Sequence, residues 1–134
     1  MSAASEILIT VPATSALLRF SRMSAAAAAA SLDFDVDELD DIRSAVGEAV
    51  GVLLSRYDGA STDPDTGADP GNFEIHLQLR PESIEIRGTR QHASLALWQE
   101  TELTAALLGA TVDEYSFDLR AGQRSFHLVK RRVS

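Results

Sequence analysis

The side chains best suited to chemistry gather in one acidic stretch. Six of the nine residues from 33 to 41 are Asp or Glu, a density of carboxylates that could hold a divalent metal ion. The same stretch is typical of a helix start, because Asp35 followed three residues later by Glu38 fits a capping box. Acidic side chains also suit the positive end of the helix dipole. We therefore interpret the stretch as a helix start rather than a metal site.

The remaining chemically capable residues form none of the common sites. His76, His92 and His127 lie far apart, never at the spacing of paired ligands on a helix. The chain has no cysteine, which excludes disulfides, thiol catalysis and cysteine-bound zinc. A Gly-x-Ser-x-Gly elbow, a Walker loop and a dinucleotide fingerprint are all missing. The sequence predicts no metal centre.

Composition and charge describe an acidic protein of one domain, residues 1–134. The chain carries 12 basic and 20 acidic residues, a formal charge of −8, and 45% of its residues are hydrophobic. The negative charge argues against general affinity for nucleic acid or for an anionic membrane. No apolar run approaches the roughly 20 residues that span a bilayer, and the N-terminus lacks the positive region of a signal peptide. We expect a cytoplasmic protein.

The first half of the chain predicts one strand and two helices. Residues 6–11 form a β-branched run that Pro12 stops, and a helix then extends into the six alanines at 25–30. The second helix follows the capping box, because apolar residues recur there every three or four positions: Leu39, Ile42, Val46, Val50, Leu53 and Tyr57. Gly47 and Gly51 on this helix indicate close packing of a backbone or of a ligand, since each costs about 1 kcal/mol relative to alanine.

The second half predicts an exposed loop followed by two hairpins that flank a helix. The loop spans residues 58–72 and contains two prolines and three glycines. The other elements are strands over 73–80 and 83–87, a helix from after His92 to Leu108 that Gly109 ends, and strands over 112–119 and 125–129. We expect Leu95, Trp98, Leu103, Ala106 and Leu107 of this helix to face inward.

This element order, β-α-α-β-β-α-β-β, predicts a two-layer α+β sandwich. Its sheet is expected to be mixed but mostly antiparallel, with the helices on one face. A small basic end made of Arg124, Lys130, Arg131 and Arg132 is either a solvated terminus or a contact patch.

Four features of the chain resemble the bacterial anti-sigma factor kinase family. They are residues 39–50 (Leu-Asp-Asp-Ile-Arg-Ser-Ala-Val-Gly-Glu-Ala-Val), the element order, the hairpin 73–87 and the ending that starts at 106–114. These small proteins belong to the GHKL ATPase superfamily, which also contains histidine kinases and Hsp90. The resemblance covers most of the chain. It implies a Bergerat-like, histidine kinase-like ATPase fold.

The resemblance also identifies where the nucleotide motifs should stand. The family presents a glutamate on the second helix and a magnesium-binding asparagine four residues on. Here Glu48 occupies the first position, but the second holds Val52, which has no oxygen to offer a metal. Glu48 is therefore either a remnant catalytic base or a surface glutamate of the helix.

The other two family motifs are also missing. Residues 87–91 read Arg-Gly-Thr-Arg-Gln where the family has the adenine-reading Asp-x-Gly-x-Gly, so Gly88 and Arg90 stand at cofactor positions without the carboxylate. Arg90 either faces a phosphate or lies in an exposed loop. The phosphate-cradling glycines correspond to residues 98–104, which contain no glycine and two carboxylates. Those acids would repel a triphosphate. We therefore predict no cofactor, with ATP and magnesium as the alternative.

Taken with these losses, the resemblance implies an anti-sigma-factor-like regulator of transcription that acts by protein–protein interaction. Its implied partners are a sigma factor, a STAS-type anti-anti-sigma protein, or both, and a second copy in a homodimer. One alternative is a divergent ATP-dependent serine kinase of an anti-anti-sigma partner, in which Glu48 polarises the attacking serine. Another is an unrelated α+β dimer.

Overall fold

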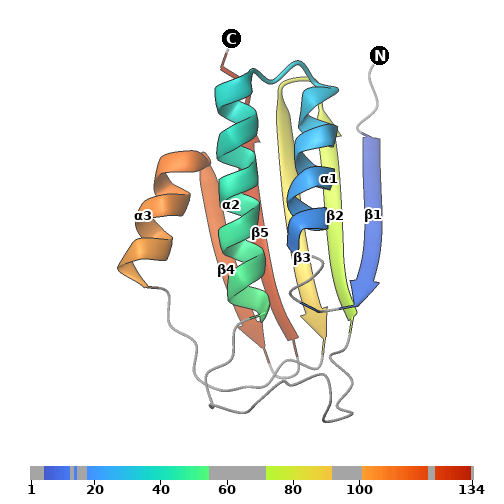
Figure 1. The fold of residues 1–134 in the computed structure, drawn as a ribbon, viewed down its shortest axis with the longest axis vertical. Coiled ribbons are helices and arrows are strands. Elements are labelled where there is room, and N and C mark those ends of the chain that lie inside the picture. Colours follow the sequence, from blue (N-terminus) through green and yellow to red (C-terminus); the bar gives the residue numbers. More distant parts are fainter. Residues whose placement is uncertain are drawn as a thin grey trace.

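The structure is a computed structural model that describes residues 5–12, 14, 18–54, 72–91, 101–120 and 123–133. Its elements follow the predicted order (Figure 1). In chain order they are β1 (Ser5–Pro12), α1 (Leu18–Ala30), α2 (Val36–Leu54), β2 (Asn72–Arg80), β3 (Ser83–Gln91), α3 (Glu102–Thr111), β4 (Glu114–Arg120) and β5 (Gln123–Arg131).

The five strands form one sheet in the order β1-β2-β3-β5-β4. The prediction of a mixed sheet is wrong for this part of the chain, because all four neighbouring pairs are antiparallel. The helical hairpin α1–α2 explains the difference. Two helices return the chain to the end at which β1 finishes, so β2 runs back beside it. Within the described residues, no helix has the length and apolar character needed to cross a membrane.

Helices α1 and α2 cover one face of the sheet, which we call the inner face, and α3 packs beside them near β4 (Figure 1). The predicted alternation of β2 is confirmed, because Phe73, Ile75, Leu77 and Leu79 are buried on the inner face. The alanine run forms a packed helix as expected, with Ala25 and Ala29 fully buried. Small side chains let α1 lie close to α2 and β2. The hydrophobic core consists of the buried side chains of α1 and α2 together with the inward residues of the strands.

The capping box at the start of α2 is also confirmed. The backbone N–H of Asp35 donates to Glu38 Oε1 at 2.9 Å, and the N–H of Glu38 donates to Asp35 Oδ1 at 2.8 Å. The Glu38 carboxylate also accepts a bond from the N–H of Val133 at 2.7 Å. One buried side chain thus holds both the start of α2 and the last described residues. No group of acids or histidines among the described residues could hold a metal ion.

Strand β3 is four residues longer than predicted and continues through Gly88 to Gln91. A glycine weakens a strand when nothing covers it. In the structure Gly88 lies opposite Phe126 on β5, and the Phe126 ring covers it. The aromatic ring fills the space that the missing side chain leaves, so the strand continues.

Helix α3 departs most from the prediction. It begins after Thr101, whose side chain accepts a bond from the N–H of Thr104, and it continues through Gly109 to Thr111. Its buried residues are Thr104 and Leu108, whereas Leu103 is 74% exposed and Ala106 is exposed, so these two inward assignments are wrong. The cap sets the phase of the helix and turns the Thr104–Leu108 face towards α2. Residues 92–100, with Leu95 and Trp98, lie outside the described part of the chain, as do Tyr57 and residues 58–71 of the predicted loop.

Candidate functional site

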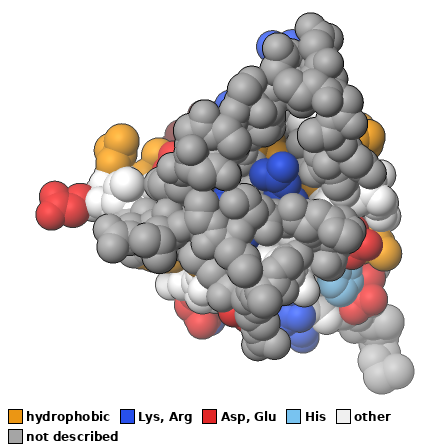
Figure 2. All heavy atoms as spheres, turned by 90° about the horizontal axis from the view of Figure 1, so that it is seen from below, with side chains coloured by type: hydrophobic (Ala, Val, Ile, Leu, Met, Phe, Trp, Pro, Cys, Tyr) orange, Lys and Arg blue, Asp and Glu red, His pale blue; other side chains and the backbone are white. Residues whose placement is uncertain are grey.

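The positions singled out by the sequence gather around the second half of α2. Glu48 and Val52 lie one turn apart on this helix, Gly88 and Arg90 lie on β3 beneath it, and α3 packs against its side. These elements meet towards the end of the molecule at which α2 finishes. Figure 2 is a view onto that end and shows Lys or Arg side chains near its centre. The fold therefore brings the predicted site residues into one region.

Glu48 is half-buried and engaged in a hydrogen bond. The hydroxyl of Thr104 on α3 donates to Glu48 Oε2 at 2.6 Å, and Thr104 itself is only 4% exposed. The hydroxyl of Thr101 donates in turn to Thr104 Oγ1 at 3.0 Å. The two hydroxyls thus form a chain of hydrogen bonds that ends on the Glu48 carboxylate and connects α3 to α2. Thr104 therefore occupies one of the two oxygens of the Glu48 carboxylate.

Val52 lies in the hydrophobic core. Its side chain is 6% exposed and belongs to the same cluster as Val50, Leu53 and the inward residues of the strands. The family position that carries a metal-binding amide is thus filled here by aliphatic packing. A polar oxygen at this position would need a hydrogen-bonding partner within that cluster.

Gly88 has no free space above it. A Cβ atom added there would lie 2.2 Å from Cε2 of Phe126, far inside van der Waals contact. The glycine is required by the ring that packs on it across the β3–β5 ladder. Its place at a nucleotide position of the family therefore has a packing explanation in this chain.

Arg90 lies neither in an exposed loop nor in open solvent, so the predicted loop position is wrong. It is on β3, 8% exposed, and its Nη1 donates to the backbone carbonyl of Leu53 at 2.9 Å. That carbonyl belongs to the last turn of α2, where acceptors lack helical partners and a cation suits the dipole. Arg90 thus caps the end of α2 from below.

The predicted basic end is divided among different roles. Arg124 is 3% exposed on β5 and directly opposite Arg90 in the ladder. Lys130 donates to Asp41 at 3.2 Å and to the carbonyl of Thr111 at 2.8 Å, and Arg131 pairs with Glu114. Two of the four cations are thus in ion pairs and a third is buried. They do not form a separate solvated patch.

Two residues of the site were missed by the sequence analysis. Thr104 was overlooked because the predicted helix began nine residues too early, although Thr-Glu-Leu-Thr at 101–104 is a normal helix start. Arg124 was assigned to the basic end because a lone arginine in a strand has no marker of burial. A Cβ atom added at Gly47 on α2 would lie 3.0 Å from Cδ of Arg22. No described atom lies within 4 Å of a Cβ added at Gly51.

The structure defines a two-layer α+β domain, in which the positions that the resemblance assigned to a nucleotide carry packed or hydrogen-bonded side chains. Comparison with solved structures bears out the fold. The chain is similar to a crystal structure of the RsbU and RsbW domains of Rv1364c from Mycobacterium tuberculosis, with a TM-score of 0.69 and 21% sequence identity. The match covers 96% of this chain and 32% of that one, so the chain spans about a third of that protein.

The resemblance to anti-sigma factor kinases of the RsbW type is thereby confirmed at the level of the fold. No family model and no curated protein matches the sequence. The nucleotide positions must therefore be judged from their own contacts.

We predict that Gly88→Ala destabilises the protein by about 1–3 kcal/mol, because the new methyl group must displace the Phe126 ring. Gly51→Ala is the matched control. It adds the same atom in a helix where no described atom is near, and should raise the free energy of unfolding by about 0.5–1 kcal/mol. Urea denaturation measures both. Equal effects of the two substitutions would contradict the packing role of Gly88.

A double-mutant cycle tests the fastening of α3. Glu48→Met and Thr104→Val should each lower the free energy of unfolding by about 1–2 kcal/mol. The double variant should cost little more than either, since methionine offers no oxygen and the same bond is lost in all three. The exposed Asp40–Arg43 pair, whose atoms lie 2.8 Å apart, is the control and should couple by no more than about 0.5 kcal/mol. Independent effects at 48 and 104 would show that the bond is not what holds α3.

Proposed function

We propose that this protein is an anti-sigma-factor-like regulator that acts by binding other proteins and has a decayed nucleotide site. The observation that carries the proposal is the pairing of an RsbW-like fold with core packing at the nucleotide positions. Val52 is part of the hydrophobic cluster, and Glu48 holds a threonine of the same chain. Such positions stabilise the fold without a ligand.

The proposed partners are a sigma factor, a STAS-type anti-anti-sigma protein, or both, in the cytoplasm. The RsbW-type fold supports this class of partner. The proposal involves no direct contact with nucleic acid or membrane, in keeping with the net charge of −8. Regulation of transcription would then follow from sequestering or releasing the partner, with no phosphate transfer required.

We also propose that the protein forms a homodimer through β1. This strand lies at the edge of the sheet and has Glu6 as its one charged side chain. Ile7 and Leu8 are 40% and 65% exposed, so the edge lacks the charges that usually prevent pairing. A second copy paired antiparallel through β1 would extend the sheet and cover these side chains. The pairing is isologous, as in most dimers.

Thermal unfolding with millimolar magnesium-ATP or magnesium-ADP tests the nucleotide part of the proposal. We expect no change in the unfolding temperature. A ligand at 100 times its dissociation constant would add about 2.7 kcal/mol and raise that temperature by several degrees. A nucleotide-binding anti-sigma factor kinase, run in parallel, shows that the assay detects such binding. A clear rise for this chain would favour the kinase alternative, and phosphate transfer by the wild type and by Glu48→Ala would then be measured.

Pairwise co-purification with the sigma factors and STAS proteins of the same genome tests the partner. We expect a stoichiometric complex with at least one of them, formed equally with and without magnesium-ATP. Sedimentation of the chain alone, in the same runs, measures whether it is a dimer. Failure to bind any protein of either class would overturn the proposed function, and a complex that forms only with ATP would overturn the decayed site.

A further inference from the structure

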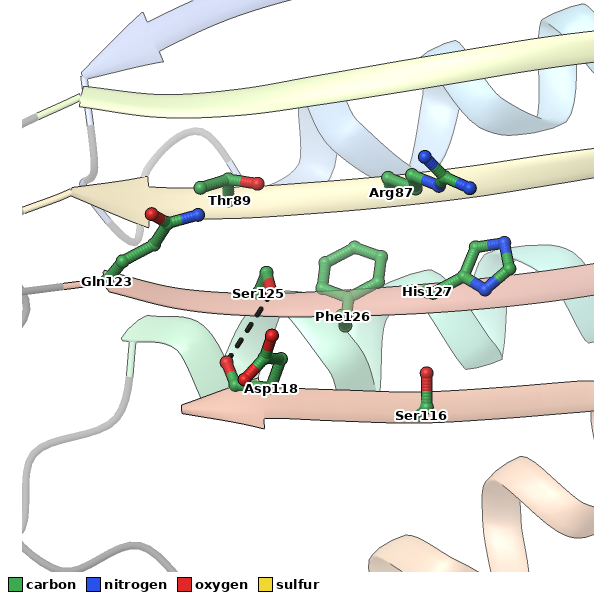
Figure 3. A pocket seen from close by; sticks show the side chains of 8 residues that line it. All are labelled: Arg87, Thr89, Ser116, Asp118, Gln123, Ser125, Phe126 and His127. Carbon is green, nitrogen blue, oxygen red and sulfur yellow. Dashed lines mark hydrogen bonds between the residues drawn. The ribbon is translucent and has the colours of Figure 1, made fainter. Parts of the chain in front are cut away.

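The face of the sheet opposite α1 and α2, which we call the outer face, contains a depression of about 290 Å³. It lies over β3, β5 and β4, with the helices behind the sheet (Figure 3). Its polar lining includes Arg87, Thr89, Ser116, Asp118, Ser125 and His127. We call this feature the outer hollow. None of these residues belongs to the region around α2 described above.

The register of the ladders explains why the sheet is hollowed here. Two neighbouring rungs cross the three strands, and short hydroxyl side chains occupy half of their positions. The rungs are Arg87–His127–Ser116 and Thr89–Ser125–Asp118. Figure 3 shows Arg87 and His127 at one end of the hollow and Asp118 towards the other. The floor thus presents hydroxyl groups, and a cation stands at one end with a carboxylate across from it.

Arg87 differs from the other basic side chains described on the outer face. Those side chains are paired with carboxylates: His76 with Glu6, Arg80 and His127 with Glu85, and Arg131 with Glu114. Among the described residues, Arg87 has no ion pair, and its side chain is exposed. An acidic protein with a formal charge of −8 thus places a guanidinium that has no ion pair among the described residues at the rim of the outer hollow.

We propose that the outer hollow is a docking site for an acidic side chain of a partner protein. A carboxylate matches the guanidinium fork, which binds it through two parallel hydrogen bonds. The hydroxyl of Ser116 is a further donor within the hollow, whereas that of Ser125 donates to the backbone carbonyl of Asp118 (Figure 3).

A partner protein is a better occupant than a free small anion. Arg87 and Asp118 are both exposed, and an ion pair in open water contributes less than about 1 kcal/mol. A protein surface laid over the flat sheet would exclude water from the pair and strengthen it. The hollow would then fix the position of the partner rather than supply most of the affinity. The outer hollow lies on the opposite face from the nucleotide positions, so this inference is independent of the proposed function.

The test is a titration of the 15N-labelled full chain, followed by amide chemical shifts. The probe is a blocked Gly-Ser decapeptide with one central Glu, compared with the same peptide containing Gln and with sodium acetate. We expect shifts at residues 87, 89, 116 and 125 that grow with the concentration of the Glu peptide up to tens of millimolar. Raising the salt from 50 to 300 mM should reduce them at least threefold. The Gln peptide should cause none.

Two variants make the result specific. Arg87→Gln should abolish the shifts, whereas Arg80→Gln, which alters an arginine already paired on the same face, should leave them. Unchanged signals elsewhere in the spectrum establish that both variants fold. Shifts at other residues, equal shifts with the Gln peptide, or no shifts at all would overturn the proposal. Acetate binding as tightly as the Glu peptide would also overturn it, in favour of a site for small anions.

Discussion

The packing of α2 on the inner face of the sheet is the interaction on which the rest of this structure depends. Its start is held by the Asp35–Glu38 capping box, and Glu38 also binds the N–H of Val133. Its end is held by Arg90, which donates to the carbonyl of Leu53. Between these two points the helix buries a continuous apolar face against the strands. With both ends fixed, α2 has little freedom to rotate about its axis. Helices α1 and α3 pack on the sides of α2 that do not face the sheet.

This constraint bears directly on the nucleotide positions. In the family that the sequence resembles, the second helix must present ligands to a nucleotide, so part of its surface has to stay open. In this chain Val52 of the same helix is buried in the core, and Glu48 is hydrogen-bonded to Thr104 of α3. The two uses compete for the same side chains. A chain that relies on α2 for its core packing would lose stability by reopening the site, which supports the proposal of a binding protein.

Much of this could be predicted from the sequence, because local patterns determine it. The alternation of residues 73–80, the Asp35–Glu38 spacing and the alanine run each identify an element through contacts within a few residues, and all three are confirmed. The errors concern residues whose roles depend on distant partners. Gly88 continues a strand only because Phe126 covers it, 38 positions away in sequence. Arg90 is buried on β3 and donates to the carbonyl of Leu53, 37 positions earlier in the sequence. No local pattern contains that information.

The site shows the same division more sharply. The position of Glu48 on α2 follows from helical spacing, but its hydrogen bond to Thr104 depends on where α3 begins, and the sequence analysis began that helix too early. A motif comparison can therefore report that a ligand is missing, as at Val52, but not what has replaced its function. The contacts at these positions appear only in the structure. Val52 packs in the core, the Phe126 ring covers Gly88, and Thr104 donates to Glu48. Each of these contacts stabilises the fold without a ligand.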